Sequence, residues 1–266
     1  MFWDTTYILV ILGAVLCAAA SWNISQTYRR YSAFSNARGL TAEAVAAMIL
    51  RGAGIPDVRI ERIGGSLTDH YSPGERVLRL SDSVYGSTSV AAIGVAAHEC
   101  GHAIQHKVGY FPLKLRSLSV PIANIGSKLY WPVILLGLIL SYMQLVQIGV
   151  LLFVFVVLFQ LITLPVEFNA SGRALRILEE RGILAGDELK GAEKVLRAAA
   201  MTYVASLFSS ILQLLRLVLL TRRDNRRRYR MKNARADGNG LRGLFPCAAA
   251  PYRAAKACIF SRIVSK

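Results

Sequence analysis

The stretch IANIGSKLYWPVILLGLILSYMQLVQIGVLLFVFVVLFQLITL, residues 122–164, decides the architecture of this chain. It holds two apolar runs, Ile122–Met143 and Leu145–Leu164, and Lys128 is its only charged residue. A helix of about 20 apolar residues is long enough to span the hydrocarbon core of a bilayer. The two runs therefore predict a transmembrane hairpin with a short turn around Gln144.

An apolar run near the N-terminus predicts a third membrane helix. Tyr7–Trp22, extendable to Ile24, contains no charged residue, whereas Arg29 and Arg30 follow it. A cleaved signal peptide would carry basic residues before its apolar core. The observed charge order instead favours a membrane anchor whose N-terminus lies outside the cytoplasm.

The last apolar stretch, residues 198–220, predicts a fourth membrane-associated helix. It is interrupted by polar residues, namely Ser209, Ser210, Gln213 and Arg216. A complete crossing would also place the arginine-rich run 222–230 outside the cytoplasm, against the positive-inside bias. A re-entrant helix, an interfacial helix and a helix packed in the core therefore stay open beside a crossing.

Basic residues predict the orientation of the spans, because cytoplasmic loops carry an excess of lysine and arginine. Residues 23–121 carry 11 Lys/Arg and residues 165–197 carry 6, so both face the cytoplasm of a multi-pass plasma-membrane protein. The expected segments are the anchor 1–24, a cytoplasmic segment 25–121, the hairpin 122–164, a second cytoplasmic segment 165–197, the fourth helix 198–220 and a basic tail 221–266.

The composition agrees with a membrane protein. The 266 residues are 54% hydrophobic and 18% charged with a mean hydropathy of +0.41, which excludes a disordered chain and an ordinary soluble domain. Four widely separated cysteines argue against a disulfide framework. Of the net charge of +16, the tail contributes +11 through 13 Lys/Arg and two Asp. We expect this tail to be a solvated, partly disordered extension and expect no nucleic-acid partner.

Shorter patterns predict a small α+β layer in the cytoplasmic segments, so that the fold class is a mainly α membrane protein with three to four membrane helices. The alternation of apolar and polar residues predicts strands, and capping residues with glycine stops predict helices. The expected elements are a helix Thr41–Arg51, strands Asp57–Ile63 and Arg76–Leu80, a helix from Ser87–Ser89 to about His106, and a helix opened by Pro165 that ends at Glu180.

The cytoplasmic segment contains a candidate metal-binding motif, His98-Glu99-Cys100-Gly101-His102. Residues four apart lie one helical turn apart, so both imidazoles can reach one metal ion. Two neutral nitrogens suit Zn²⁺, and Glu99 lies beside the same stripe, where it can take a proton from water. The alternative is a half-buried helix with surface histidines. The motif favours a zinc site with Glu99 as the catalytic residue.

A third metal ligand has to come from elsewhere on the same side of the membrane. His106 is excluded because it lies roughly 12 Å along the helix from His98. Glu167 follows the hairpin and lies on the cytoplasmic side, as a His₂Glu zinc site requires. The alternative for Glu167 is a carboxylate that complements a helix dipole. We expect His98, His102 and Glu167 to be the metal ligands.

These motifs resemble the YugP-type neutral zinc metallopeptidases of bacterial membranes over roughly residues 5–223. The resemblance rests on segments 67–71, 77–81, 84–85, 94–99, 101–106 and 164–168. It implies a zincin-like layer in which His98 and His102 bind zinc and Glu99 is the catalytic acid/base. Glu167 matches the downstream glutamate of the gluzincin type. Two positions depart from the pattern: Ser171 replaces an aspartate, and Ser72-Pro73 replaces Asp-Pro.

Residues outside the motif are candidates for substrate contacts. The strand Arg76–Leu80 offers an edge on which an extended peptide could add. His70, Tyr71 and Arg173 are candidates for substrate or oxyanion contacts. The alternative for His70 and Tyr71 is packing of loop residues on the strand.

Together these patterns predict a membrane-embedded zinc metalloendopeptidase that acts on peptides or membrane proteins, with its active site facing the cytoplasm. Two alternatives belong to other classes. An intramembrane site-2-type protease would need an Asp-Gly motif on a later span, and no predicted span has one. A non-catalytic membrane scaffold would hold zinc with four protein ligands.

Overall fold

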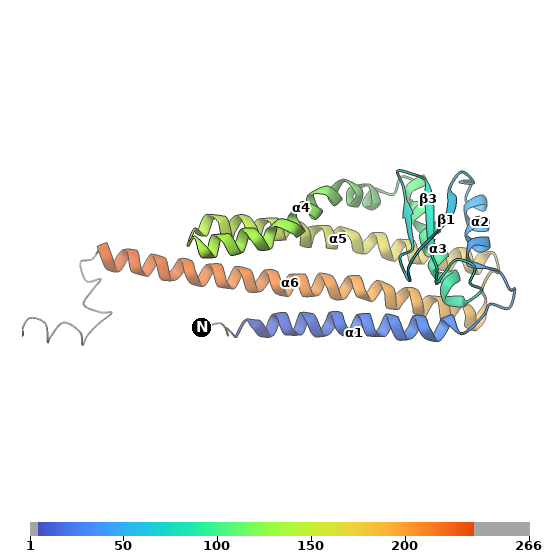
Figure 1. The fold of residues 1–266 in the computed structure, drawn as a ribbon, viewed down its shortest axis with the longest axis horizontal. Helices are drawn as coiled ribbons and strands as arrows, with labels where there is room; N and C mark the ends of the chain where they lie inside the picture. Colours follow the sequence, from blue (N-terminus) through green and yellow to red (C-terminus); the bar gives the residue numbers. More distant parts are fainter. Residues whose placement is uncertain (1–4, 237–266) are drawn as a thin grey trace, which may run out of the picture. The chain divides into compact units, whose positions relative to one another are not determined.

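A computed structural model describes residues 5–236, with side chains described to residue 221. In this part of the chain the fold is mainly α, with six helices and three strands (Figure 1). The elements are α1 (Tyr7–Ser32), α2 (Ala42–Gly52), β1 (Arg59–Ile63), β2 (His70–Ser72), β3 (Val77–Ser81), α3 (Val90–Lys107), α4 (Phe111–Ile139), α5 (Met143–Glu180) and α6 (Gly186–Ala236). The chain divides after Arg216 into two units, and the core and the candidate site described below lie in the first.

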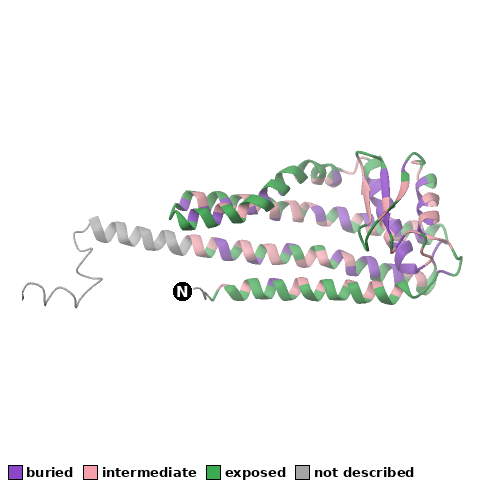
Figure 2. Cartoon of the chain, viewed as in Figure 1, coloured by how far each residue is buried: buried purple, intermediate pink, exposed green. Residues whose placement is uncertain are grey.

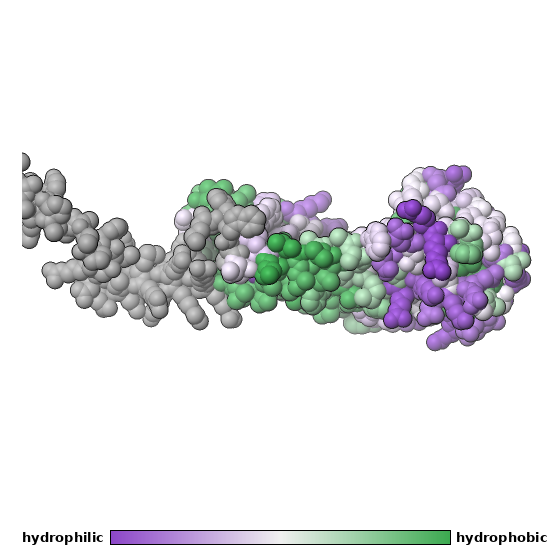
Figure 3. Space-filling model, turned by 90° about the horizontal axis from the view of Figure 1, so that it is seen from below, coloured by the Kyte–Doolittle hydropathy of each residue, from purple (hydrophilic) through white to green (hydrophobic). Residues whose placement is uncertain are grey.

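Four of these helices are long and apolar enough to cross a membrane. They are α1, α4, α5 and the part of α6 between Gly186 and Thr221. Their apolar side chains are largely exposed, as at Leu118 (73%) and Ile139 (71%), which suits contact with lipid. Figure 3 shows the hydrophobic surface over the helices, while hydrophilic side chains gather at the end that carries the sheet. The predicted membrane class is therefore confirmed. Of the predicted basic tail, residues 237–266 lie outside the described residues.

Two predicted helix boundaries are wrong. The hairpin turns at Leu140–Tyr142 and not around Gln144, because Ser141 adopts φ 52° and the Tyr142 N–H bonds the Gly137 carbonyl at 2.8 Å. Pro165 does not open a helix but lies inside the continuous α5. Proline is tolerated within membrane helices because packing against neighbours compensates for the lost backbone hydrogen bond. One continuous helix therefore runs from the hairpin to Glu167 and beyond.

The sheet has the order β1-β3-β2, with β1 parallel and β2 antiparallel to β3. The strand predicted at Arg76–Leu80 is β3 and lies in the centre, so both of its sides are already paired. The prediction that this strand offers a free edge is therefore wrong. The edge strands are β1 and β2, and the three residues of β2 were too few to show a periodic pattern.

The core lies between the sheet, α2, α3 and the end of α5. Leu78, Ile49, Ile93 and Leu178 are among its fully buried side chains. Figure 2 shows that buried residues concentrate in α3 and the adjoining elements, whereas α1 is mostly exposed. The helix α3 is therefore held on several sides, which fixes the direction of the side chains that it carries.

Candidate metal centre

The helix α3 presents His98 and His102 on one face. It begins after Ser89, whose Oγ accepts a hydrogen bond from the Ala92 N–H at 3.2 Å, and it runs without a break to Lys107. The two imidazole rings lie one turn apart with centroids separated by 4.7 Å, nearly perpendicular to each other. This arrangement brings both Nε2 atoms to the same side of the helix.

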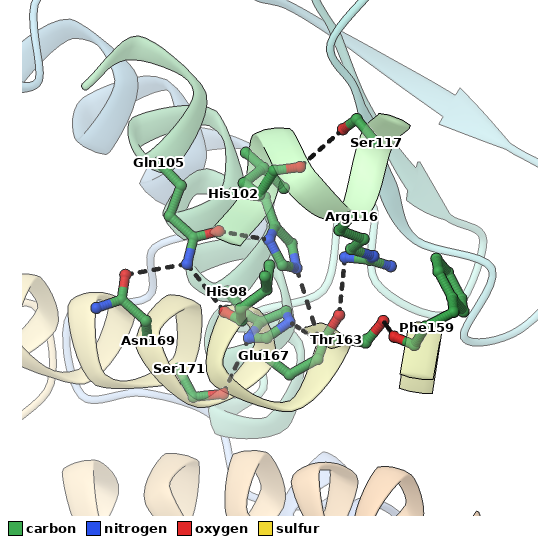
Figure 4. Close-up of polar contacts among 12 residues, drawn as sticks. His98, His102, Gln105, Arg116, Ser117, Phe159, Thr163, Glu167, Asn169 and Ser171 are labelled. Atoms are coloured by element: carbon green, nitrogen blue, oxygen red, sulfur yellow. Dashed lines mark hydrogen bonds and ion pairs between the residues drawn. The ribbon is translucent and has the colours of Figure 1, made fainter. Parts of the chain in front are cut away.

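The helix α5 brings Glu167 to these imidazoles. Its Oε2 lies 3.3 Å from His98 Nε2 and 3.7 Å from His102 Nε2, although Glu167 comes 65 positions after His102 in the chain (Figure 4). The three ligand atoms lie within 4.8 Å of one another, and Glu167 is only 3% exposed. Two imidazole nitrogens and one carboxylate are a donor set that fits zinc and leaves a fourth position for water.

Hydrogen bonds orient both imidazoles for this role. His98 Nδ1 contacts Ser171 Oγ at 3.1 Å, and His102 Nδ1 contacts Gln105 Oε1 at 3.1 Å. The Gln105 amide nitrogen donates to the Val166 carbonyl and to Asn169 Oδ1, so its oxygen must face His102 (Figure 4). His102 Nδ1 therefore donates to the Gln105 oxygen, which leaves its Nε2 free to bind a metal, and the Ser171 hydroxyl can accept from His98 Nδ1 in the same way.

Burial and charge set the protonation of His102 in the metal-free site. Burial lowers the pKa of this imidazole, but the contact with Glu167 and the negative charge of Glu99 outweigh burial, so the pKa of His102 is raised. Metal binding therefore has to release a proton from His102 at low pH. Cys100 lies on the other side of α3, where burial raises the pKa of its thiol and leaves it unreactive.

Glu99 lines a cavity of about 280 Å³ together with His98 and Glu167. It is 8% exposed and does not belong to the three-residue ligand group. The same cavity is lined by Tyr203 of α6 and Tyr28 of α1. Glu99 thus shares a cavity with His98 and Glu167 without belonging to the group of ligand atoms.

His70, Tyr71 and Arg173, the candidates for substrate or oxyanion contacts, lie outside the lining of this cavity. Among the described side chains, none of the three lines it. Tyr71 hydroxyl contacts His106 Nδ1 at 3.0 Å on the exposed side of α3, which agrees with the exclusion of His106 as a ligand. Arg173 Nε donates to Asn169 Oδ1 at 2.7 Å and so supports the partner of Gln105.

Sequence reasoning missed three residues around the site. Gln105 orients His102, Arg116 Nη1 lies 3.0 Å from Glu167 Oε1, and Tyr203 lines the cavity. The sequence placed Gln105 in the interior of a helix, counted Arg116 among the cytoplasmic charges, and placed Tyr203 in a membrane-associated helix. Their roles depend on contacts between α3, α4, α5 and α6.

The helices α3 and α5 approach each other closely at Gly101, in the middle of the motif. A Cβ atom there would lie 2.6 Å from the Ala170 carbonyl oxygen, so the α5 backbone would have to move. We expect Gly101→Ala to cost about 1–3 kcal/mol of stability and to weaken zinc binding, because His98 and His102 separate from Glu167.

The matched control is Gly94→Ala on the same helix, whose added Cβ would meet Ala192 Cβ at an ordinary 3.4 Å. Thermal unfolding and zinc titration of both variants measure the difference. Equal zinc affinity in Gly101→Ala and the wild type would contradict the importance of this contact.

Comparison with known proteins identifies the family. Residues 6–222 match the family model described as "Putative neutral zinc metallopeptidase". The chain is also 42% identical over 212 residues to the "Putative membrane protease YugP" of Bacillus subtilis (strain 168), covering 80% of this chain and 94% of that relative. No solved structure matches the chain. The chain belongs to the neutral zinc metallopeptidase family, and it is a membrane protein, as its resemblance and its four candidate spans predicted.

Proposed function

We propose that the protein is a membrane-embedded zinc endopeptidase with His98, His102 and Glu167 as zinc ligands and Glu99 as its catalytic residue. The observation that carries this proposal is the group formed by two Nε2 atoms and a buried carboxylate, all within 4.8 Å, beside a cavity that Glu99 also lines. Family membership supports the same chemistry.

In the proposed reaction, zinc and Glu99 have different roles. Zinc, when bound, polarises the scissile carbonyl and lowers the pKa of water at its open position. Glu99 accepts a proton from the attacking water as the new carbon–oxygen bond forms. The carbon–nitrogen bond then breaks, and Glu99 returns the proton to the leaving amine.

The cavity supports a substrate at the surface of the membrane. Its apolar lining comes largely from candidate spans and includes Ile24, Val195, Leu196, Ala199 and Ala200. An extended peptide with an apolar side chain next to the scissile bond would suit this lining. We therefore propose membrane-proximal peptides or membrane proteins as substrates. The lysine and arginine distribution supports a site that faces the cytoplasm.

The ligand count favours a catalytic over a structural zinc site. Structural zinc sites are closed by four protein ligands. Among the residues with described side chains, the ligand group has three members. The intramembrane alternative has less support, because α3 is not among the candidate spans of the described chain.

Full-length protein in detergent or lipid vesicles allows a direct test. We expect one bound zinc per chain and cleavage of an acetylated and amidated apolar peptide, because blocked ends admit only endopeptidase activity. A chelator should abolish cleavage and added zinc should restore it. Absence of cleavage by zinc-loaded protein across a peptide library, or equal cleavage without metal, would contradict the proposal.

A further inference from the structure

The two oxygens of Glu167 have different neighbours. Oε2 faces the imidazoles of His98 and His102 at 3.3 and 3.7 Å, whereas Oε1 lies 3.0 Å from Arg116 Nη1 (Figure 4). The guanidinium and the imidazoles therefore hold opposite ends of one buried carboxylate. Arg116 belongs to α4, the first helix of the hairpin, and has no part in the metal-binding motif.

Packing of α4 aims Arg116 at this carboxylate. Leu113, three residues earlier, is 7% exposed, while Phe111 and Leu118 are exposed by 71% and 73% on the other side of the helix. The buried side of this segment thus carries Leu113 and Arg116, because residues three apart share a helix face. Pairing with Arg116 also compensates the cost of burying Glu167 at 3% exposure.

A positive charge this close to the proposed ligands weakens the binding of a cation, so the charge of Arg116 does not by itself explain why an arginine lies here. The geometry of its contact with Glu167 does explain it. A carboxylate with both oxygens free can bind one metal ion through both and take up two coordination positions. A carboxylate with one oxygen held by a guanidinium, which binds oxygen atoms through directed N–H groups, has one oxygen left for the metal.

We infer that Arg116 is a positioning residue that reserves Oε1 of Glu167, so that Glu167 binds zinc through Oε2 alone. This inference rests on the proposed function, because it assumes that Glu167 is a ligand. Zinc then has two imidazoles and one oxygen as protein ligands, and its fourth position stays open for water and substrate. The first helix of the hairpin thereby controls the coordination number of the metal.

Cobalt(II) in place of zinc tests this inference without relying on activity. Tetrahedral Co²⁺ absorbs visible light more strongly than five-coordinate Co²⁺, so the spectrum reports the coordination number. We expect an intense spectrum for the wild type and a weaker, five-coordinate spectrum for Arg116→Met, with one Co²⁺ bound in both. Arg116→Lys should restore part of the intensity because lysine keeps one charged donor. In the zinc form, kcat/KM of Arg116→Met should fall about 10- to 100-fold.

The matched control is Lys114→Met, which removes a positive charge from an exposed position on the same helix. It should keep the spectrum and the activity of the wild type. An unchanged spectrum in folded Arg116→Met would overturn the inference, and so would the same change in Lys114→Met. If the wild type itself binds no Co²⁺, or if Glu167→Ala binds it with an unchanged spectrum, the proposed ligand set fails instead.

Discussion

Glu99→Gln is expected to abolish peptide hydrolysis while zinc stays bound. General acid–base catalysis by a positioned side chain contributes about 10²- to 10⁴-fold, and a glutamine amide cannot accept the proton of the attacking water. Glutamine has nearly the shape of glutamate, and Glu99 lies outside the group of ligand atoms. The loss should therefore fall on kcat and leave zinc content at one per chain.

Turnover of a blocked peptide and metal analysis of the same sample measure these two effects. Glu61→Gln, an equivalent change on the edge strand β1, should retain both activity and zinc. Undiminished turnover by Glu99→Gln would remove Glu99 from the mechanism. Loss of zinc together with activity would instead make Glu99 part of the metal site.

Glu167→Ala is expected to weaken zinc binding by more than about 100-fold. Removal of a hydrogen-bond partner of a metal ligand already costs about 10- to 100-fold in affinity, and loss of a ligand should cost more. The substitution also leaves Arg116 without its carboxylate, so that an unpaired positive charge faces the cation position. Both effects lower affinity in the same direction.

Competition with a chromophoric chelator measures the zinc affinity of Glu167→Ala beside His98→Ala. Glu179→Ala, an exposed position near the end of the same helix α5, should bind zinc as the wild type does. If His98→Ala loses zinc and Glu167→Ala retains it fully, the third ligand lies elsewhere.

The central part of this arrangement followed from local spacing and from topology. The four-residue spacing of His98 and His102 requires only a helix to bring the imidazoles together, and α3 is that helix. Glu167 was predicted because the two spans of the hairpin return the chain to the side from which it left, and because it matches the downstream glutamate of the family that the chain resembles. The structure indeed brings its carboxylate to the imidazoles. These inferences succeeded because they depend on helix geometry and hydropathy, which are local or nearly so.

Predictions about boundaries and edges failed where distant segments decide the outcome. Pro165 lies inside α5 because packing of a membrane helix compensates for the hydrogen bond that proline removes. The strand β3 was predicted to have a free edge, but the three-residue strand β2 pairs with that edge. Neither the packing nor the pairing leaves a periodic signal in the chain.

By itself, the sequence determined that this is a membrane protein, which helix carries the paired imidazoles, and which carboxylate beyond the hairpin could join them. Only the tertiary structure decided how that carboxylate is held, with Arg116 of α4 at one oxygen and the imidazoles of α3 at the other. It also showed that Gln105 and Ser171 hold the imidazole Nδ1 atoms. The physical reason is that apolar periodicity and helical spacing act along the chain, whereas a hydrogen bond between helices depends on how they pack.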